Sequence, residues 1–574
     1  MFATNGNLVA DKGGCTVTGK ILSLNSGPTV LLNRLCEDID FEETLNRLLS
    51  WDPARSKLSP GTRIKALVIN ILTGRDPLYK VERFYREQDV ELLFGPGVTA
   101  DDLNDDGLAR ALDKLYEATP WAVYSTLALH ALRKLSLGLG PLHCDTTSFS
   151  LEGAYEREGD LTITYGYSKD HRPDLKQILL GLGVTPQRIP VLANVEDGNT
   201  SDKTWNHTFI RKLRQTLSQE DWENVLYVAD SALITGHNLK CMVRLKLSFV
   251  SRLPDLFAVG EQVKQEAWQT GHWQDIGALH AGQEAATYQM QSFVREIKHR
   301  SYRLVVVYSS QLDERKARSL DRQIQKEEQT LQQAWAALQE TVFHCEADAR
   351  QAIESFQRDH RSPWFAWETD VQSMTHPVKR AHRGRPRKDE VPTFETVYVP
   401  VLAKWERNEA TIEQHKRMLS TFVLISNAES SRYTDVELLR TYKGQEAAET
   451  RFRLLKDAQL VDGIFLKTPE RIAALGIVLV MALLLYGILE DRIRRQMERE
   501  TEPLRVPGRS RDYQPTGQVL LEILQRIKVI RIERVDIDER ILADNADDLA
   551  RRIVRMAGYD MAMYTASPIT AVSC

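Results

Sequence analysis

The chain has 574 residues, of which 42% are hydrophobic and 27% charged, with a formal net charge of −4 at neutral pH. These values exclude a largely disordered chain and a protein coated in basic surface, so any nucleic-acid binding requires local basic patches. The six cysteines lie far apart with no Cys-x-x-Cys pair, which excludes a recognisable zinc module and a dense disulfide framework and favours a reducing cytoplasm.

The N-terminal part of the chain is expected to be mainly helical. Apolar residues recur at helical spacing over 41–51 and 63–73, Ser59-Pro60 is a helix-start signal, and a further helix is expected over 108–116. The first residues show no basic stretch followed by an apolar core, so no signal peptide is expected. Such a helical module suits either DNA binding or simple packing, and packing is the more common role.

After Gly138 the pattern changes to short apolar runs separated by turn residues. The expected elements are, in order, strands over 142–147, 161–167 and 189–194, a helix over 204–217 and a strand over 225–230. Strands followed by a helix and a further strand predict an α/β core with a mixed sheet.

A long segment then interrupts this core. Strands are expected over 288–294 and 302–308, followed by a charged helical region over 311–360. This region is either a coiled-coil arm or an amphipathic helix packed on its own domain, and the second interpretation is favoured. The tryptophans of the segment are expected to pack in a core rather than to stack on an unpaired base. They are Trp364, Trp367 and Trp405.

The core is expected to resume with a strand over 421–426. Thr434 and Glu437 form a capping-box signature for the next helix. The uncharged run 472–489 is long enough to cross a membrane, but a buried helix of an α/β core has the same composition. We favour the buried helix, because this run is isolated and follows other core elements.

These patterns divide the chain into five segments, each with its own expected fold. They are a helical N-terminal domain over 1–135, the first part of the α/β core over 136–240, an insertion over 241–420, the second part of the core over 421–500 and a helical tail over 501–574.

Two acids stand at the ends of expected strands. Asp145 follows the apolar run that starts at Pro141, and Asp230 directly follows four apolar residues. An aspartate at a strand end often only caps a turn, and for either residue alone this interpretation is as good as a catalytic one. Nearby, His143 is expected to be structural and Asp202 to be an ordinary turn acid.

A third acid, Glu449, is expected on a helix together with Tyr442, Gln445 and Lys456. Their spacings of three, four and seven residues place all four side chains near one helical face. Three converging acids without a Cys or His cluster suit hard divalent cations such as magnesium. The chemistry that this arrangement favours is phosphoryl transfer on a nucleic-acid backbone.

The spacing Tyr442-x2-Gln445-x3-Glu449-x6-Lys456 resembles the Tyr-x2-Arg-x3-Glu-x6-Lys helix of the DDE-type insertion-sequence transposases. Asp145-Thr-Thr and Val228-Ala-Asp230 look like the segments that carry the first two acids of that family. The run 166–175 looks like the segment between those acids, and the long interval before Glu449 matches a subgroup with an inserted domain. One departure is Gln445, which lacks the charge and the bidentate fork of the family's arginine. The nearby Arg451 and Arg453 offer a replacement charge.

The resemblance implies a ribonuclease H-like core, split by an insertion, that cuts the terminal inverted repeats of an insertion sequence and joins them to target DNA. It implies two Mg²⁺ ions, with Mn²⁺ as a substitute, and a homodimer on DNA in the cytoplasm without a membrane. The alternative is a catalytically inactive, transposase-derived DNA-binding protein. The implied catalytic and metal-binding residues are Asp145, Asp230 and Glu449, and the implied DNA contacts are Tyr442, Gln445 and Lys456.

A second motif lies in the insertion. Residues 379–388 contain six Lys or Arg in ten positions, and Arg383-Gly384-Arg385-Pro386 at their centre resembles the AT-hook. An extended Arg-Gly-Arg-Pro segment fits the narrow A·T minor groove, where the negative potential is enhanced. A basic loop without sequence preference is an equal alternative, and DNA phosphate binding is expected in either case.

Overall fold

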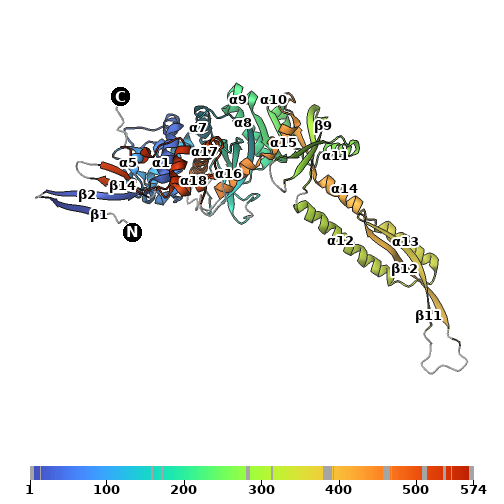
Figure 1. Cartoon of the computed structure of the whole chain (residues 1–574). Coiled ribbons are helices and arrows are strands. Elements are labelled where there is room, and N and C mark those ends of the chain that lie inside the picture. Colours follow the sequence, from blue (N-terminus) through green and yellow to red (C-terminus); the bar gives the residue numbers. More distant parts are fainter. Residues whose placement is uncertain are drawn as a thin grey trace. The chain divides into compact units, whose positions relative to one another are not determined.

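The computed structural model describes residues 6–12, 15–156, 159–169, 172–279, 285–311, 314–378, 391, 393–456, 466, 468–506, 514–533, 538–544 and 546–567. The chain divides into two compact units. The first unit comprises Met1–Pro254 and Ser426–Cys574, and the second comprises Asp255–Ile425. Figure 1 labels the elements of both units.

The first unit contains a group of packed helices near its N-terminus. The helices expected over 41–51, 63–73 and 108–116 are confirmed, and Ser59 caps its helix by accepting a hydrogen bond from the Thr62 N–H at 3.0 Å. Buried leucine, isoleucine and valine side chains hold the group together. The elements are α1 (Gly27–Asp38), α2 (Phe41–Leu48), α3 (Pro60–Thr73), η1 (Leu78–Lys80), α4 (Val81–Tyr85), α5 (Val90–Phe94), η2 (Ala100–Leu103), α6 (Asp105–Glu117) and α7 (Pro120–Lys134).

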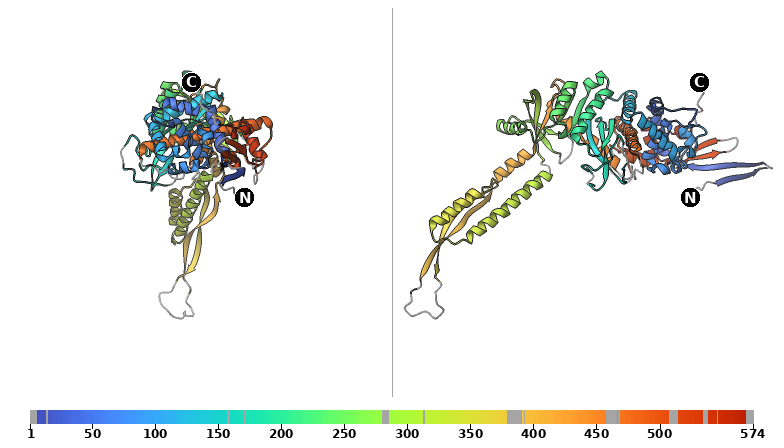
Figure 2. Two further views of the ribbon diagram at one scale, coloured as in Figure 1. Left: turned by 90° about the vertical axis from the view of Figure 1, so that its left-hand side faces the viewer. Right: turned by 180° about the vertical axis from the view of Figure 1, so that it is seen from behind.

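Strands from the two ends of the chain form one antiparallel sheet in the order β1-β2-β14-β15. Figure 2 shows β2 beside β14, although roughly 500 residues separate them in sequence. The predictions of a helical N-terminal domain and a helical tail were therefore wrong for these strands, because their pairing is non-local. The strands are β1 (Gly6–Lys12), β2 (Cys15–Leu24), β14 (Val529–Glu533) and β15 (Asp538–Leu542), and the tail also contains α18 (Gly517–Leu524), α19 (Asp548–Met556) and η4 (Met561–Tyr564).

The centre of the first unit is a mixed sheet in the order β5-β4-β3-β6-β7. The strand β4 runs antiparallel to both β3 and β5, whereas β6 runs parallel to β3 and to β7. The expected α/β class with a mixed sheet is confirmed at this level. The strands are β3 (Pro141–Leu151), β4 (Lys176–Val184), β5 (Pro190–Asp197), β6 (Leu226–Ala229) and β7 (Ser248–Arg252), connected by α8 (Asp202–Thr216), α9 (Gln219–Asn224), η3 (Ser231–Leu233) and α10 (Gly236–Leu245).

The predicted strand over 161–167 is not a strand, and the sequence missed β4. Residues 161–167 make a single β-bridge, from Thr164 to Gln177 at the start of β4. The rest of this edge of β4, from Ile178 onward, is paired with β5. The strand β4 was hard to recognise because it is buried along nearly its whole length and contains Gly181. A Cβ at Gly181 would lie 2.0 Å from the indole Nε1 of the buried Trp205, so the glycine makes room for that ring.

The apolar run over 472–489 lies in α17 (Pro469–Glu500), which packs against α3, α6 and β5. Among the described residues, this one helix is long and apolar enough to cross a membrane, and 94% of its apolar window is buried inside the chain. The prediction of a buried core helix is confirmed.

The second unit contains neighbouring strands, a hairpin and long helices. The strands β13, β10, β9 and β8 are neighbours in that order, and β11 and β12 form a separate two-stranded hairpin. The basic run 379–388, including Arg383, Gly384, Arg385 and Pro386, follows β11 in sequence and lies outside the described residues. The elements are α11 (Ala258–Thr270), β8 (Gln274–Ala278), β9 (Thr287–Ile297), β10 (Arg300–Ser309), α12 (Glu314–Gln339), α13 (Glu346–Asp359), β11 (Phe365–Pro377), β12 (Phe394–Arg407), α14 (Glu409–Leu419) and β13 (Thr421–Ser426).

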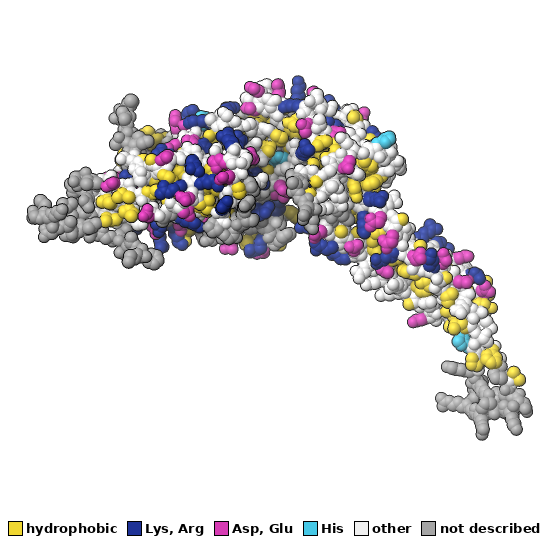
Figure 3. Space-filling view, in the orientation of Figure 1, with side chains coloured by type: hydrophobic (Ala, Val, Ile, Leu, Met, Phe, Trp, Pro, Cys, Tyr) yellow, Lys and Arg dark blue, Asp and Glu magenta, His cyan; other side chains and the backbone are white. Residues whose placement is uncertain are grey.

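The charged helical region of the second unit packs on its own domain. Leu320 and Ile324 of α12 are buried in a cluster with Trp364, and the rings of Trp367 and Trp405 stack beside it at 5.6 Å. Figure 3 shows Lys and Arg interspersed with Asp and Glu on the outer surface of these helices. The interpretation as an amphipathic helix with a solvated face is therefore confirmed, and the three tryptophans contribute to packing.

Candidate active site

Two of the three candidate acids lie side by side. The strands β3 and β6 pair in parallel with His143 opposite Val228, and Asp145 and Asp230 each follow two residues later. Because side chains two residues apart share a face, both carboxylates project from the same side of adjacent strands. Asp230 also caps η3 by accepting a hydrogen bond from the Ala232 N–H at 3.0 Å, so it has the structural role that the sequence allowed.

Lys169 and Asp202 complete the polar group around Asp145. The Lys169 Nζ lies 3.8 Å from Asp145 Oδ1 and 3.5 Å from Asp202 Oδ2. The same ammonium donates hydrogen bonds to the carbonyl and hydroxyl oxygens of Thr146, both at 2.8 Å. The Thr146 hydroxyl in turn donates to Asp202 at 2.5 Å. Asp202, expected to be an ordinary turn acid, thus belongs to the same site.

The site holds more negative than positive charge in half-buried surroundings. Burial raises the pKa of Asp145 to about 6, Lys169 and the Thr146 N–H oppose this, and Asp230 and Asp202 raise it further. Burial also raises the pKa of Asp230, with a further rise from Asp202 and an opposing effect of Lys169. Three carboxylates therefore share one nearby ammonium, and a further cation would relieve their repulsion.

The third candidate acid lies on a helix that packs against the same sheet. Glu449 lies on α16 (Glu446–Lys456), which packs against β3 and β4, and its side chain is exposed. Among the described residues, no three His, Cys, Asp or Glu side chains are grouped closely enough to hold a metal ion. The structure therefore brings Asp145 and Asp230 together, but these two acids and Glu449 do not form a group of three that could hold a metal ion.

Tyr442 lies between the acids. Burial raises the pKa of its phenol, the negative charges of Asp230 and Glu449 raise it further, and the positive charge of Arg252 lowers it. Arg252 is the last residue of β7, next to the strand that leads into Asp230. The phenol is therefore protonated at neutral pH, near Asp230 and Glu449.

The prediction of one continuous helix from Tyr442 to Lys456 was wrong. Tyr442 belongs to α15 (Asp435–Lys443), the chain turns at Gly444 and Gln445, and α16 follows with Lys456 as its last residue. A Cβ at position 444 would lie 3.2 Å from the imidazole Cε1 of His143, so only glycine fits this close turn without displacing that ring. The predicted capping box of α15 at Thr434 and Glu437 is present.

Two neighbouring residues have structural roles. His143 is buried beneath Gly444, and burial lowers its pKa to about 4, so it is neutral at neutral pH. Arg451 pairs with Glu490 inside the core, and it is therefore unavailable to replace the charge missing at Gln445. Arg453 is exposed on α16.

The sequence analysis missed Lys169 and Arg252 as members of the site. Lys169 lies at a turn, and its position between the first two acids was the only feature of the sequence that pointed to it. Arg252 ends a short strand, Ser248–Arg252, and the parallel pairing of that strand with β6 was the only indication that it would lie near Asp230. Both assignments required the three-dimensional pairing of the strands.

Comparison with known proteins adds one match. A family model described as a domain of unknown function, DUF4277, matches residues 28–129. The matched segment corresponds to the N-terminal helices from α1 to α7 and contains none of the site residues. None of the curated proteins compared with the chain is similar to it.

We predict that Asp145→Asn stabilises the protein at alkaline pH. Because the pKa of Asp145 is about 6 in the folded chain and 3.8 ordinarily, the folded state binds more protons between these values, and stability falls as pH rises through them. The asparagine removes this cost, so its free energy of unfolding should exceed that of the native chain by up to about 3 kcal/mol at pH 8, because the two pKa values differ by roughly two units, and should nearly match it near pH 4. Urea unfolding at both pH values measures the difference. A variant that is less stable at pH 8 would contradict the prediction.

Proposed function

We propose that the chain is a DDE-type DNA transposase with a ribonuclease H-like core interrupted by an insertion. The observation that carries the proposal is the pair Asp145 and Asp230: Asp145 lies within β3, and Asp230 directly follows the end of the adjacent parallel strand β6. Asp145 lies on the first strand of the central sheet, as the family resemblance implies. The second unit, Asp255–Ile425, occupies the interval before Glu449 in which this family subgroup carries its insertion.

The pair Asp145 and Asp230 fits a hard divalent cation. Both side chains offer carboxylate oxygens, and the raised pKa values record an excess of negative charge that a cation would neutralise. We assign Mg²⁺, with Mn²⁺ as a substitute, and include Glu449 as the third ligand of the complete site. When bound, such cations neutralise charge on a phosphate and lower the pKa of a bound water or hydroxyl.

The remaining residues of the site then act on the DNA backbone. Lys169 and Arg252 supply positive charge on either side of the acids, and the protonated Tyr442 donates a hydrogen bond to a phosphate oxygen. Gln445, in the turn between α15 and α16, and Lys456, the last residue of α16, contact the DNA backbone farther from the acids. The proposed reaction is cleavage at terminal inverted repeats and strand transfer into target DNA by a homodimer in the cytoplasm.

Cleavage of DNA that flanks the coding sequence tests this function. We expect the native chain to nick the flanking repeats only with Mg²⁺ or Mn²⁺, and Asp230→Asn and Glu449→Gln each to lower the rate at least about a hundredfold. Glu43→Gln, which neutralises an exposed acid on α2, is the matched control and should cleave normally. Gel-shift binding in EDTA checks that each variant still binds DNA.

The outcomes separate the two candidate functions. Cleavage that survives in Asp230→Asn would place the active site elsewhere. Specific binding without cleavage by the native chain would favour the inactive, transposase-derived DNA-binding protein. The observations that favour this second candidate are Gln445 in place of arginine and the finding that Glu449 does not form, with the paired acids, a group of three that could hold a metal ion.

A further inference from the structure

The helices α8 and α10 pack against each other, and each carries basic residues along one side. Three basic residues of α8 follow one another at intervals of four, and three of α10 fall within two turns of one face, so each helix aligns these basic side chains. The opposite sides of both helices are buried. We call this surface the α8/α10 basic face, and it consists of Lys203, His207, Arg211, His237, Lys240 and Arg244.

No carboxylate neutralises this face within the described part of the chain. The only acid on either helix is Asp202, and its carboxylate is held by Thr146 and Lys169. None of the six residues forms an ion pair with a described carboxylate. By contrast, Lys212 on the same α8 helix pairs with Glu196 at 2.7 Å. The α8/α10 basic face therefore carries uncompensated charge.

The two histidines show how closely these groups are gathered. The Nε2 atoms of His207 and His237 lie 3.1 Å apart, and the ring centroids are 4.1 Å apart. Burial, His237 and the positive charges of Arg211 and Arg244 all lower the pKa of His207. The same two arginines would repel a metal cation at the histidine pair, whereas an anion would be attracted to all of these groups.

We propose that the α8/α10 basic face binds the phosphodiester backbone of DNA. Lys203 and Arg211 are eight residues apart, so the row on α8 extends about 12 Å, which spans roughly three to four backbone steps of a strand. The row starts beside Asp202, a member of the candidate active site, so the bound strand continues from the site where cleavage is proposed. The choice of DNA as the polyanion rests on the proposed function.

Fluorescence-anisotropy titration of a labelled random-sequence DNA duplex in EDTA tests this surface without cleavage. The test variant combines Lys203→Gln, Arg211→Gln and Arg244→Gln. The matched control combines Arg505→Gln, Arg551→Gln and Arg555→Gln, which removes three exposed charges from the C-terminal part. Circular dichroism checks that both variants retain the native fold.

We expect the test variant to bind about tenfold more weakly at physiological salt and to lose roughly 2 to 3 from the slope of log K against log salt, because each phosphate contact contributes about 0.9. The control variant should lose less affinity and less of the salt slope than the test variant. Equal affinity of test variant and native chain, equal weakening of test and control variants, or no DNA binding by the native chain would each overturn the proposal. If the native chain bound DNA in this way but did not nick the flanking repeats, the proposed function would be contradicted and the binding result would stand.

Discussion

Replacing Arg451 by methionine is expected to lower the free energy of unfolding by about 3 kcal/mol, because the buried Glu490 loses its closest ion-pair partner and keeps only the longer contact with Arg494, at 3.4 Å. The Arg451 Nη2 lies 2.8 Å from Glu490 Oε2, and the two side chains are only 1% and 3% exposed. The Arg451 Nε also donates to the Arg188 carbonyl at 2.5 Å, and its guanidinium lies over the Tyr486 ring. The pair thus joins α16 to α17 and to the turn before β5.

Urea unfolding of Arg451→Met measures this loss. The control is the double variant Arg451→Met with Glu490→Leu, which removes both charges and should recover most of the stability. Arg453→Met, on an exposed position of the same helix, should change the free energy of unfolding by less than about 0.5 kcal/mol. A loss below about 1 kcal/mol in Arg451→Met would show that Glu490 finds another partner or becomes protonated.

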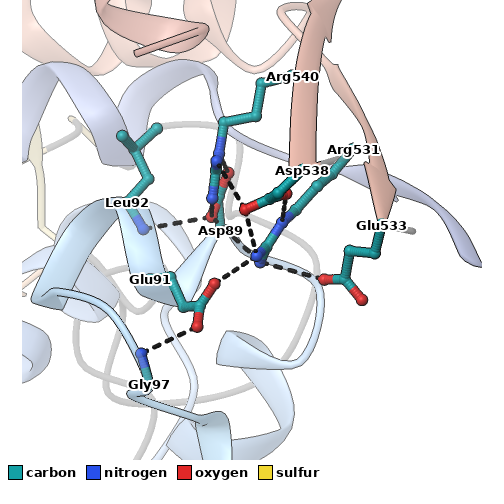
Figure 4. A network of polar contacts seen from close by, with 8 residues as sticks. All are labelled: Asp89, Glu91, Leu92, Gly97, Arg531, Glu533, Asp538 and Arg540. Carbon is teal, nitrogen blue, oxygen red and sulfur yellow. Dashed lines mark hydrogen bonds and ion pairs between the residues drawn. The ribbon is translucent and has the colours of Figure 1, made fainter. Parts of the chain in front are cut away.

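Asp89→Asn is expected to cost a similar amount, about 3 kcal/mol, because the buried Arg540 would keep only its longer contact with Asp538, at 3.4 Å. Asp89 accepts two hydrogen bonds from Arg540, at 2.6 and 3.1 Å, and the side chains are 0% and 1% exposed. Asp89 also caps α5 through the Leu92 N–H at 3.2 Å. Figure 4 shows this network, in which Arg531 contacts Glu91 and Asp538 beside the buried pair.

Chemical unfolding and hydrogen exchange measure the effect of Asp89→Asn. Because the pair joins the N-terminal helices to the β14–β15 hairpin, amides of Val529–Glu533 and Asp538–Leu542 should lose protection first. Asp538→Asn is the matched control, since its side chain is 42% exposed and such surface pairs contribute at most about 1 kcal/mol. Equal effects of the two substitutions would argue against a special role of the buried pair.

Local patterns in the sequence were sufficient for several elements. The capping box at Thr434 and Glu437, the helix start at Ser59 and the apolar run within α17 each depend on neighbouring residues, and each is present in the structure. The strand β4 could not be recognised in this way. Its glycine at 181 is explained only by the indole of Trp205, which comes from another element.

The candidate site shows the same division. The sequence identified Asp145 and Asp230 because each follows an apolar run, and the parallel pairing of β3 and β6 places them side by side. Lys169 and Arg252 carried no comparable signal, because their roles depend on which strands are neighbours. The break at Gly444 was missed, and the residue that this glycine packs against, His143, lies about 300 residues away in sequence.

The sequence by itself determined the α/β class, the type and approximate bounds of several helices, and the two acids of the central sheet. Periodicity, capping and strand-end acids are local, so a single stretch of chain is enough to reveal them. Only the tertiary structure decided that the chain ends share one sheet, that Lys169 joins the acids, and that α8 and α10 align their basic residues. Those features arise from contacts between distant segments, where packing and charge act between elements that no local pattern connects.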